Sequence, residues 1–334
     1  MRLEIADLKT FDDDRVDCFI LDKKTNGEFI NTIKYLSYHP NGKFIDRSIV
    51  VYDGDSNDIR AVMPCVETGD RIVSHPGTTF AGIIVDYRNC SLFDFAEYLE
   101  AIEGYLKEKG YRFLELRVTP NVFFRSPRED FLFYFLKNGY TIAGINSSNV
   151  IPLIPLKDEA KRLLNYKSKR RNHIKKSLKE GRFQLVRSEL QAKDWEHLTS
   201  NLKEKYGVNP THSCDEMLNL MRLFPENIEM YKAIEKDTGV CGAFSVVYKF
   251  KNVYHTQYLD LSYDYASQYP HLFLIHNLIA IASEQNFDYL SFGSFTENWG
   301  EFVNKGLYNY KNEYGGGAVN LYKLVKPIKE ESNE

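Results

Sequence analysis

One pattern of strands and turns occurs twice in this 334-residue chain, at an offset of 180 residues. Val50–His75 and Met230–His255 each hold three short runs of alternating apolar residues, separated by turns rich in Asp, Asn and Gly. Alternation bounded by such turns is typical of antiparallel strands. The two segments therefore predict one three-stranded meander in each half of the chain.

The elements expected after each meander also repeat. Amphipathic helices are predicted over Leu92–Lys109 and Pro270–Gln285, followed by Gly110 and Asn286 as left-handed caps. Each half then continues with a buried strand, a helix and a closing strand: KGYRFLELRV, Arg128–Asn138 and Tyr140–Leu153 in the first half, and QNFDYLSFGS, Trp299–Glu313 and Ala318–Leu324 in the second. This order predicts an α/β protein with mixed sheets (α+β) and two tandem units, 1–155 and 156–334, joined at the prolines of IPLIPLKDEA.

Composition excludes several classes of protein. A hydrophobic content of 43% and an aromatic content of 14% are sufficient for two ordinary cores and argue against disorder. The net charge of −3 argues against a general polycation. The five cysteines are scattered without a CxxC or Cys/His cluster, which predicts reduced thiols in a cytoplasmic protein and no metal site. The acidic start lacks the apolar segment of a signal peptide, and no apolar run is long enough to span a bilayer.

Three segments carry a resemblance to a known family: the basic helix and strand of Tyr166–Val186, the helix-to-strand passage Asn286–Ser294, and Lys305–Gly317 with its KGLYNYKNEYGGG run. Together with the element order, they make the chain similar to the FemABX-like group, which has two tandem GNAT-like acyl-CoA N-acyltransferase units. That group includes peptidyltransferases of bacterial cell-wall crossbridges and exopolysaccharide acyltransferases. The resemblance implies acyl or aminoacyl transfer to an amino group of a cell-envelope sugar or peptidoglycan-type precursor, in cell-wall or polysaccharide biosynthesis.

A departure from the family pattern leaves the acyl donor open. Acetyl-CoA-dependent members carry a glycine-containing turn before the central helix, and its backbone N–H groups hold the pyrophosphate. Here the corresponding turns, SQYPHL and YRNCSL, have no glycine. The resemblance makes Gln268, Tyr269 and His271 the candidate cofactor-binding residues, while Pro270 removes one donor. The donor is therefore either an acyl-CoA or, as in the crossbridge enzymes, an aminoacyl-tRNA.

Acyl transfer needs a proton acceptor for the attacking amine and a group that stabilises the oxyanion. The candidate catalytic residues lie near strand ends of the second unit. His255 is either a base with a pKa near neutrality or a hydrogen-bonded structural residue. Asp260 is either a base strengthened by its apolar surroundings or a turn-capping residue, and Glu297 either orients the amine or is a plain exposed acid. The resemblance implies that Lys311 faces the cleft, where its charge would polarise the acyl carbonyl or contact phosphate. Helical spacing alone suggests a solvated lysine.

Two segments of the first unit are candidates for acceptor binding. In SHPGTTFAG, glycines interrupt an expected strand, so Ser74, His75 and Thr78 either bind the polar head of an acceptor or belong to a β-bulge. In SYHPNGKFIDRS, Lys43 and Arg47 flank a turn. That turn is either an anion-recognising loop or a plain connection.

Basic residues are concentrated at the start of the second unit. Eleven Lys and Arg residues, Arg170 and Arg171 among them, lie between Lys161 and Arg187, against the single acid Glu180. This predicts either a solvated helix face or a site for an anionic partner, such as a nucleotide-sugar phosphate, a tRNA acceptor arm or an anionic membrane surface. An alternative to an enzyme also stands, in which a catalytically degenerate GNAT fold acts as a nucleic-acid- or ligand-binding module.

Overall fold

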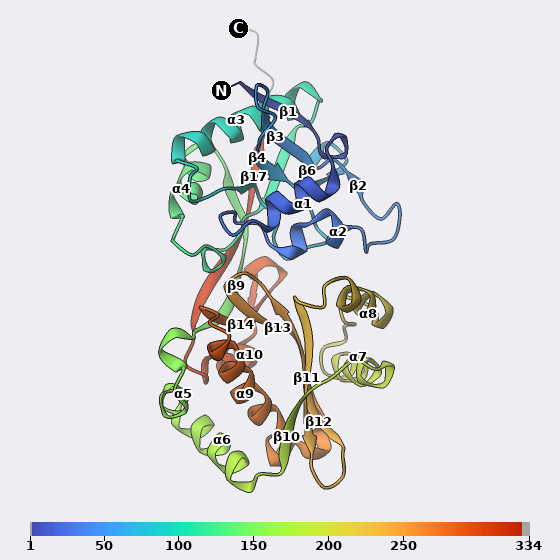
Figure 1. Cartoon of the computed structure of the whole chain (residues 1–334), viewed down its shortest axis with the longest axis vertical. Helices are drawn as coiled ribbons and strands as arrows, with labels where there is room; N and C mark the ends of the chain where they lie inside the picture. Colours follow the sequence, from blue (N-terminus) through green and yellow to red (C-terminus); the bar gives the residue numbers. More distant parts are fainter. Residues whose placement is uncertain (1, 329–334) are drawn as a thin grey trace. The chain divides into compact units, whose positions relative to one another are not determined.

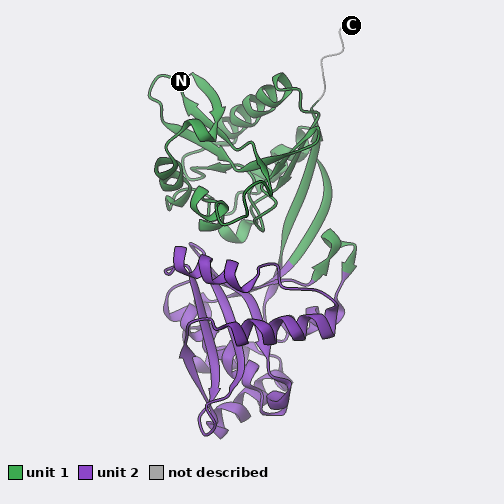
Figure 2. Cartoon of the chain, turned by 90° about the vertical axis from the view of Figure 1, so that its right-hand side faces the viewer, with its two compact units in different colours: residues 1–147, 296–302, 319–334 green, residues 148–295, 303–318 purple. Residues whose placement is uncertain are grey.

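The computed structural model of the chain describes residues 2–328. These residues form two compact units (Figure 2). Unit 1 comprises residues 2–147, 296–302 and 319–328, and unit 2 comprises residues 148–295 and 303–318. Two long strands, β9 (Thr141–Pro152) and β17 (Gly317–Pro327), have residues in both units.

Unit 1 contains a four-stranded antiparallel sheet in the order β1-β3-β4-β7 and a second set of strands in the order β17-β8-β6-β5-β2. Strands β6 and β8 pair in parallel, whereas β17 with β8, β6 with β5 and β5 with β2 pair antiparallel. Its elements are β1 (Leu3–Asp7), η1 (Leu8–Thr10), α1 (Asp13–Leu21), η2 (Phe29–Asn31), α2 (Ile33–Leu36), β2 (Ile45–Asp46), β3 (Ile49–Asp53), β4 (Ile59–Met63), β5 (Cys65–Thr68), β6 (Arg71–Ser74), β7 (Ile84–Val85), α3 (Leu92–Glu108), β8 (Phe113–Arg117), η3 (Asn121–Phe123), α4 (Glu129–Lys137), β15 (Thr296–Glu297) and η6 (Asn298–Gly300).

The core of unit 1 forms where helix α3 packs its apolar stripe onto the strands. Phe95, Leu99 and Ile102 recur at helical spacing, and all three are buried. Ser91 caps the helix by accepting from Asp94 N, and Gly110 follows the helix in a left-handed conformation. The predicted helix and its cap are thereby confirmed.

Unit 2 is built on strands in the order β10-β11-β12-β13-β14-β9. Strands β13 and β14 pair in parallel, whereas the neighbouring pairs from β10 to β13, and β14 with β9, are antiparallel. Its elements are η4 (Ile154–Leu156), α5 (Glu159–Asn165), α6 (Ser168–Glu180), β10 (Phe183–Arg187), α7 (Ala192–Tyr206), α8 (Cys214–Leu223), β11 (Ile228–Glu235), β12 (Cys241–Lys249), β13 (Val253–Leu261), η5 (Tyr263–Gln268), α9 (Pro270–Glu284), β14 (Tyr289–Ser294) and α10 (Lys305–Asn312); β16 (Phe302–Val303) lies at the unit boundary.

Helices cover both faces of the unit 2 sheet (Figure 1). Helix α9 is apolar around most of its surface and buries Leu274, Leu278 and Ile279 completely, each worth about 2 kcal/mol of burial. Helices α7 and α8 lie on the opposite face, where Trp195 packs edge-on against Tyr258. The catalytic candidates of this unit are thus divided between two sheet faces.

The mixed α/β fold is confirmed, but two elements differ from the prediction. The meander of the first half is interrupted at Pro64: β4 and β5, on either side of it, pair into different sheets. Proline cannot donate a ladder hydrogen bond, so the strand breaks there. The helix predicted from Trp299 begins only at Lys305, because Asn298 and Trp299 have left-handed φ angles of 47° and 56°.

Candidate active site

Strands β13 and β14 pair over a short stretch only. Their parallel register runs from Val253–Tyr289 to His255–Ser291, while β13 continues to Leu261. A bulge in the pairing of β12 with β13 adds to the irregularity of the strand at this point. Beyond His255, β13 remains paired with β12 but has no register with β14.

Lys311 of α10 reaches the end of β14. Its side-chain nitrogen donates to the carbonyl oxygens of Gly293 at 3.1 Å and Ser294 at 2.6 Å. The residue is only 8% exposed, and burial lowers the pKa of its amine to about 7. Asn304 holds the start of the helix by accepting from Leu307 N. Lys311 is therefore a fixed, buried amine whose charged and neutral forms are both populated near neutral pH.

His255 lies beside the same strand end. Its Nδ1 is 3.1 Å from Ser291 Oγ, and a Cβ added at Gly293 would lie 3.2 Å from His255 Cε1. Burial, followed by the charge of Lys311, lowers the pKa of His255 to about 4. The expected pKa near neutrality is thus wrong, because an apolar enclosure and a nearby cation both disfavour the imidazolium. At neutral pH the ring is uncharged.

Asp260 faces the other side of the sheet, toward α7. Its Oδ2 lies 2.5 Å from His197 Nδ1, and its Oδ1 accepts from Asn201 at 2.7 Å. His197 and Asn201 are four residues apart on one helix, so both reach the same carboxylate. Asp260 is 5% exposed. It ties α7 to β13, with a side-chain imidazole as its partner.

Glu297 is an exposed residue of the short β15–β16 hairpin and belongs to unit 1. The candidate residues of β13, β14 and α10 belong to unit 2. Proximity along the sequence therefore does not place Glu297 in the same unit as Lys311.

The turn before α9 contains Gln268, Tyr269 and His271. Tyr269 is left-handed at φ 61°, and its ring stacks on His173 with centroids 4.4 Å apart. Buried atoms Gln268 Oε1 and His271 Nδ1 have no hydrogen-bond partner among the described residues. Burial and then the charge of Arg170 lower the pKa of His271 to about 4.

This turn does not match a glycine-lined pyrophosphate cradle. Pro270 begins the helix without an N–H, and the turn carries the stacked Tyr269 ring where such a cradle has glycine. A cavity of about 400 Å³ beside the turn is lined by Gln268 and Ser267 and by charged residues of both signs.

Arg170 and Arg171 lie next to each other on α6 but have different surroundings. Arg170 is 9% exposed, pairs with Glu313, and lies over the rings of Tyr310 and Tyr314. Arg171 is partly exposed. Arg170 therefore anchors α6 to the segment that carries Lys311. Of the two arginines, only Arg171 is accessible to a partner at the surface.

Seven of the eleven basic residues form no ion pair with any described residue. The other four pair with carboxylates, for example with Glu235 and Glu229. Of the seven, Arg162 is buried and donates to the backbone carbonyl oxygens of Leu156 and Lys157. The remaining six are exposed or partly exposed: Lys161, Lys167, Lys169, Lys175, Lys179 and Arg171. The accessible unpaired positive charge is thus smaller than the sequence suggests, and it lies on α5, α6 and the turn between them.

The candidate residues of SHPGTTFAG surround the end of β6 in unit 1. Ser74 Oγ accepts from Arg117 N at 2.7 Å, and Thr78 Oγ1 donates to the carbonyl oxygen of Phe80 at 2.9 Å. Both side chains are buried. They hold the loop in shape instead of pointing into solvent.

Cationic groups gather around His75. Its ring stacks with His39 at 5.7 Å, and burial, followed by the charges of His39, Arg117 and Lys43, lowers the pKa of His75 to about 3. Arg117 forms no salt bridge with a described residue, and its buried Nε has no hydrogen-bond partner among them. The cluster of His39, Lys43, His75 and Arg117, termed here the His75 cluster, is suited to an anion.

Arg47 lies away from the His75 cluster. Its guanidinium pairs with Glu67 at 2.8 Å and lies 3.1 Å from Tyr111 Oη. It lines a cavity of about 240 Å³ together with Asp7 and Tyr105. Arg47 therefore lines a cavity whose lining includes no member of the His75 cluster.

The sequence patterns did not single out Arg117, Trp299 or His197. Arg117 and Lys323 lie over the Trp299 ring, 5.2 and 4.8 Å from its centroid. The usable signals were an arginine ending a buried strand and an Asn-Trp-Gly triplet inside a predicted helix. His197 gave no signal, since nothing in the pattern of α7 pairs it with β13.

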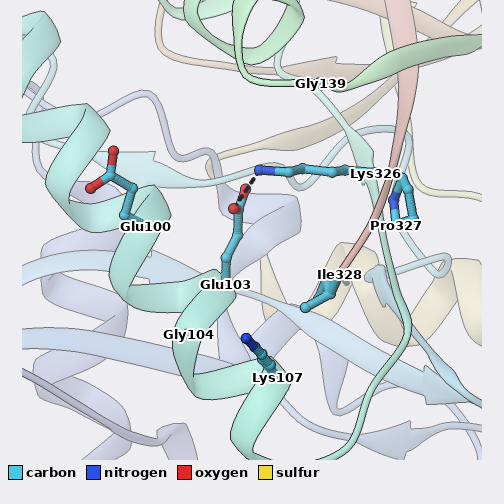
Figure 3. Close-up of a pocket in the computed structure, with 8 residues that line it drawn as sticks. All are labelled: Glu100, Glu103, Gly104, Lys107, Gly139, Lys326, Pro327 and Ile328. Atoms are coloured by element: carbon cyan, nitrogen blue, oxygen red, sulfur yellow. Dashed lines mark hydrogen bonds and ion pairs between the residues drawn. The ribbon is translucent and has the colours of Figure 1, made fainter. Parts of the chain in front are cut away.

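A cavity of about 540 Å³ in unit 1 is lined in part by charged side chains (Figure 3). Lys326 pairs with Glu103 at 2.5 Å and also lies over the Tyr140 ring, and Tyr140 donates to the same carboxylate. The central charges thus satisfy one another. Across the described residues there is no group of three or more metal-ligating side chains and no helix of the length and apolarity that a membrane span requires.

No protein-family model matches the chain, and no curated protein matches its sequence. Solved structures do match it. The crystal structure of FemX aligns with a TM-score of 0.72 at 12% identity, over 98% of this chain and 97% of that one. The structure of L-PGS from Bacillus licheniformis aligns at 0.53 and 14% identity, over 96% and 93%. A tandem GNAT protein from the clavulanic acid biosynthesis pathway aligns at 0.50 and 12% identity, over 99% and 100%. The chain has the FemABX-like tandem GNAT fold.

Proposed function

We propose that the protein is an N-acyltransferase that moves an acyl or aminoacyl group onto an amino group of a cell-envelope sugar or peptidoglycan-type precursor. The observation that carries the proposal is the buried Lys311 amine, held at the strand end where β13 and β14 separate. A fold resembling that of FemX supports the same class of reaction.

The reaction forms one bond and breaks one. The acceptor nitrogen attacks the acyl carbonyl carbon, the C–N bond forms, and the C–O bond of an ester donor (or the C–S bond of a thioester) breaks. The nitrogen loses a proton and the leaving hydroxyl or thiol gains one. Negative charge develops on the carbonyl oxygen in the transition state, so a positioned donor lowers the barrier.

Lys311 is assigned to that oxygen. A protonated amine has three N–H groups, and the carbonyls of Gly293 and Ser294 accept two of them. The third is free for the substrate oxygen. His255, uncharged at neutral pH, is assigned to accept the proton of the attacking amine.

An aminoacyl-tRNA is the donor that we favour. The turn before α9 lacks the glycine-lined cradle of an acetyl-CoA enzyme. The six accessible unpaired cations of α5, α6 and the turn between them provide sequence-independent attraction for a phosphate backbone. For the acceptor, we propose that the His75 cluster binds an anionic group, such as the phosphate of a nucleotide-sugar-type substrate.

The test is a transfer assay with aminoacyl-tRNA and acyl-CoA donors offered separately. Lys311→Ala should lower kcat by about 100-fold or more, and Lys305→Ala, an exposed lysine on the same helix, should leave it unchanged. Unaltered spectra of the folded variant would show that the loss is chemical. Full activity of Lys311→Ala would contradict the assignment.

A binding module without catalysis is the second candidate, favoured by the turn before α9. A thermal-shift screen against acyl-CoAs, UDP-sugars and tRNA separates the two functions when it is combined with the assay. Stabilisation by tRNA without any transfer would support the module, and transfer from either donor would exclude it.

A further inference from the structure

Unit 2 has a cavity that the proposed transfer reaction does not use. Its volume is about 620 Å³, and it lies on the α7 face of the sheet, between the first turns of that helix and strands β10–β13. Val186, Ile234, Val240 and Phe244 provide apolar walls. A volume of this size is typical of small-molecule sites.

Two polar pairs, each with a buried carboxylate, form part of the lining. Lys232 donates to Asp194 at 2.6 Å, and both side chains are less than one-tenth exposed. Asp194 also accepts from Gln191 N at the start of α7, so its position is fixed twice. An ion pair removed from water this far is costly unless further polar partners are supplied, and Lys232 has N–H groups beyond the one given to Asp194.

The second pair is Asp260 with His197. Because a carboxylate can only accept, Nδ1 of His197 carries the proton in this contact, and in the uncharged ring Nε2 is then the acceptor nitrogen. The His197 side chain is 45% exposed, and Nε2 has no partner among the described residues. A buried carboxylate that orients an imidazole in this way produces a directed acceptor within a cavity.

The charges that remain open have both signs. Lys193 and Asp264 are exposed members of the lining, and neither forms a salt bridge with a described residue. A purely anionic ligand would meet Asp264 and Asp260, and a purely cationic one would meet Lys193 and Lys232. A ligand with both charges avoids each repulsion.

We propose that this cavity binds a small zwitterionic amino compound, an amino acid or a dipeptide. His197 Nε2 accepts a hydrogen bond from the ligand ammonium, and Lys193 with the free N–H groups of Lys232 receives the carboxylate. The apolar walls take the side chain. The site is a binding site of unit 2 and does not rest on the transfer chemistry of Lys311.

The experiment uses the full chain and four probes. L-alanine and L-alanyl-L-alanine carry both charges, N-acetyl-L-alanine lacks the ammonium, and L-alaninamide lacks the carboxylate. Binding is followed by titration calorimetry and by the ring resonances of His197. The zwitterions should bind and shift those resonances. The affinity of each single-charge probe should be lower by about tenfold or more.

Variants keep the proposal testable if one of them is unstable. His197→Gln retains a donor for Asp260 but loses the directed acceptor, so it should weaken zwitterion binding about tenfold. Lys203→Gln, an exposed change on the same helix, should have no effect. The absence of binding by both zwitterions, or equal binding of either single-charge probe, would overturn the proposal, as would unchanged affinity in a folded His197→Gln protein.

Discussion

The Lys311 side-chain nitrogen lies 2.6 Å from the carbonyl oxygen of Ser294, at the end of β14. A backbone carbonyl cannot give up its partner without cost, and the amine is buried too deeply to be solvated instead. The two groups therefore hold each other in place. This fixed amine has consequences for stability as well as for catalysis.

Stability should depend on the titration of Lys311. Its pKa is about 7 in the folded chain, against an ordinary lysine value of 10.5, so between those pH values the unfolded state binds the proton and the folded state does not. The free energy of unfolding should therefore rise with pH across this window, by up to about 1.4 kcal/mol per pH unit from this group, and the dependence should vanish below it. Urea unfolding from pH 6 to 10 measures the slope.

Lys311→Met removes the titrating group and should flatten that slope relative to the parent chain. Lys305→Met is the matched control, since Lys305 is exposed on the same helix. A parent slope that persists in Lys311→Met would show that the amine keeps its ordinary pKa.

Catalysis should have the opposite pH dependence. If the ammonium form stabilises the oxyanion, kcat should fall as the pH rises through about 7. The Lys311→Arg variant keeps its charge at every accessible pH. The fall of kcat at alkaline pH should therefore shift to higher pH in this variant, even if its absolute rate is lower. A pH–rate profile of the two proteins, measured under saturating donor, distinguishes this from a structural role for the lysine.

The fold and the candidate site were predictable to different degrees. The helices before the buried strands were predictable because apolar spacing and left-handed caps are local properties; Asn286, at φ 62°, is one such cap. The break at Pro64 was readable in principle, but its consequence, two strands in different sheets, depends on distant pairing partners.

The site depends on contacts between distant residues. Lys311 was found because a motif carried it, but its carbonyl partners are some 18 residues away in the chain. The low pKa of His255 arises from burial and a neighbouring cation, neither of which a strand pattern reveals. Asp260 was singled out alone, and its partner His197 is 63 residues distant.

Anion binding by the His75 cluster should depend on Arg117. Arg117→Gln removes a guanidinium that forms no salt bridge with a described carboxylate and whose Nε has no hydrogen-bond partner among the described residues, so affinity for inorganic pyrophosphate should fall about tenfold or more. Arg112→Gln removes an equal charge from an exposed residue that lies 3.7 Å from Asp70, and should change affinity little. Calorimetry at fixed ionic strength measures both affinities. Equal losses of affinity in the two variants would show that the effect comes from net charge and would contradict a specific role for Arg117.

Nucleic-acid binding should depend on α6. Replacing Lys169, Lys175 and Lys179 by glutamine should weaken tRNA binding and reduce the slope of log K against log salt by about 2 to 3. The control, Lys23, Lys24 and Lys137 to glutamine, removes the same charge from unit 1. Filter binding at several salt concentrations measures both slopes. Equal slopes in the two triple variants would assign the effect to overall charge and exclude a specific role for α6.

The hairpin that carries Trp299 should tolerate no side chain at Gly144. A Cβ there would lie 2.6 Å from Trp299 Cβ, closer than such atoms approach, and the left-handed backbone of Trp299 leaves the hairpin little room to adjust. Gly144→Ala should lower the free energy of unfolding by about 2 kcal/mol and change the fluorescence of Trp299. Gly104→Ala meets nothing within 4 Å on the helix α3 and should instead stabilise the chain by about 0.5–1 kcal/mol. Two alanine variants of equal stability would show that Trp299 does not pack against Gly144, and the opposite signs expected here isolate the steric contact from the general effect of replacing glycine.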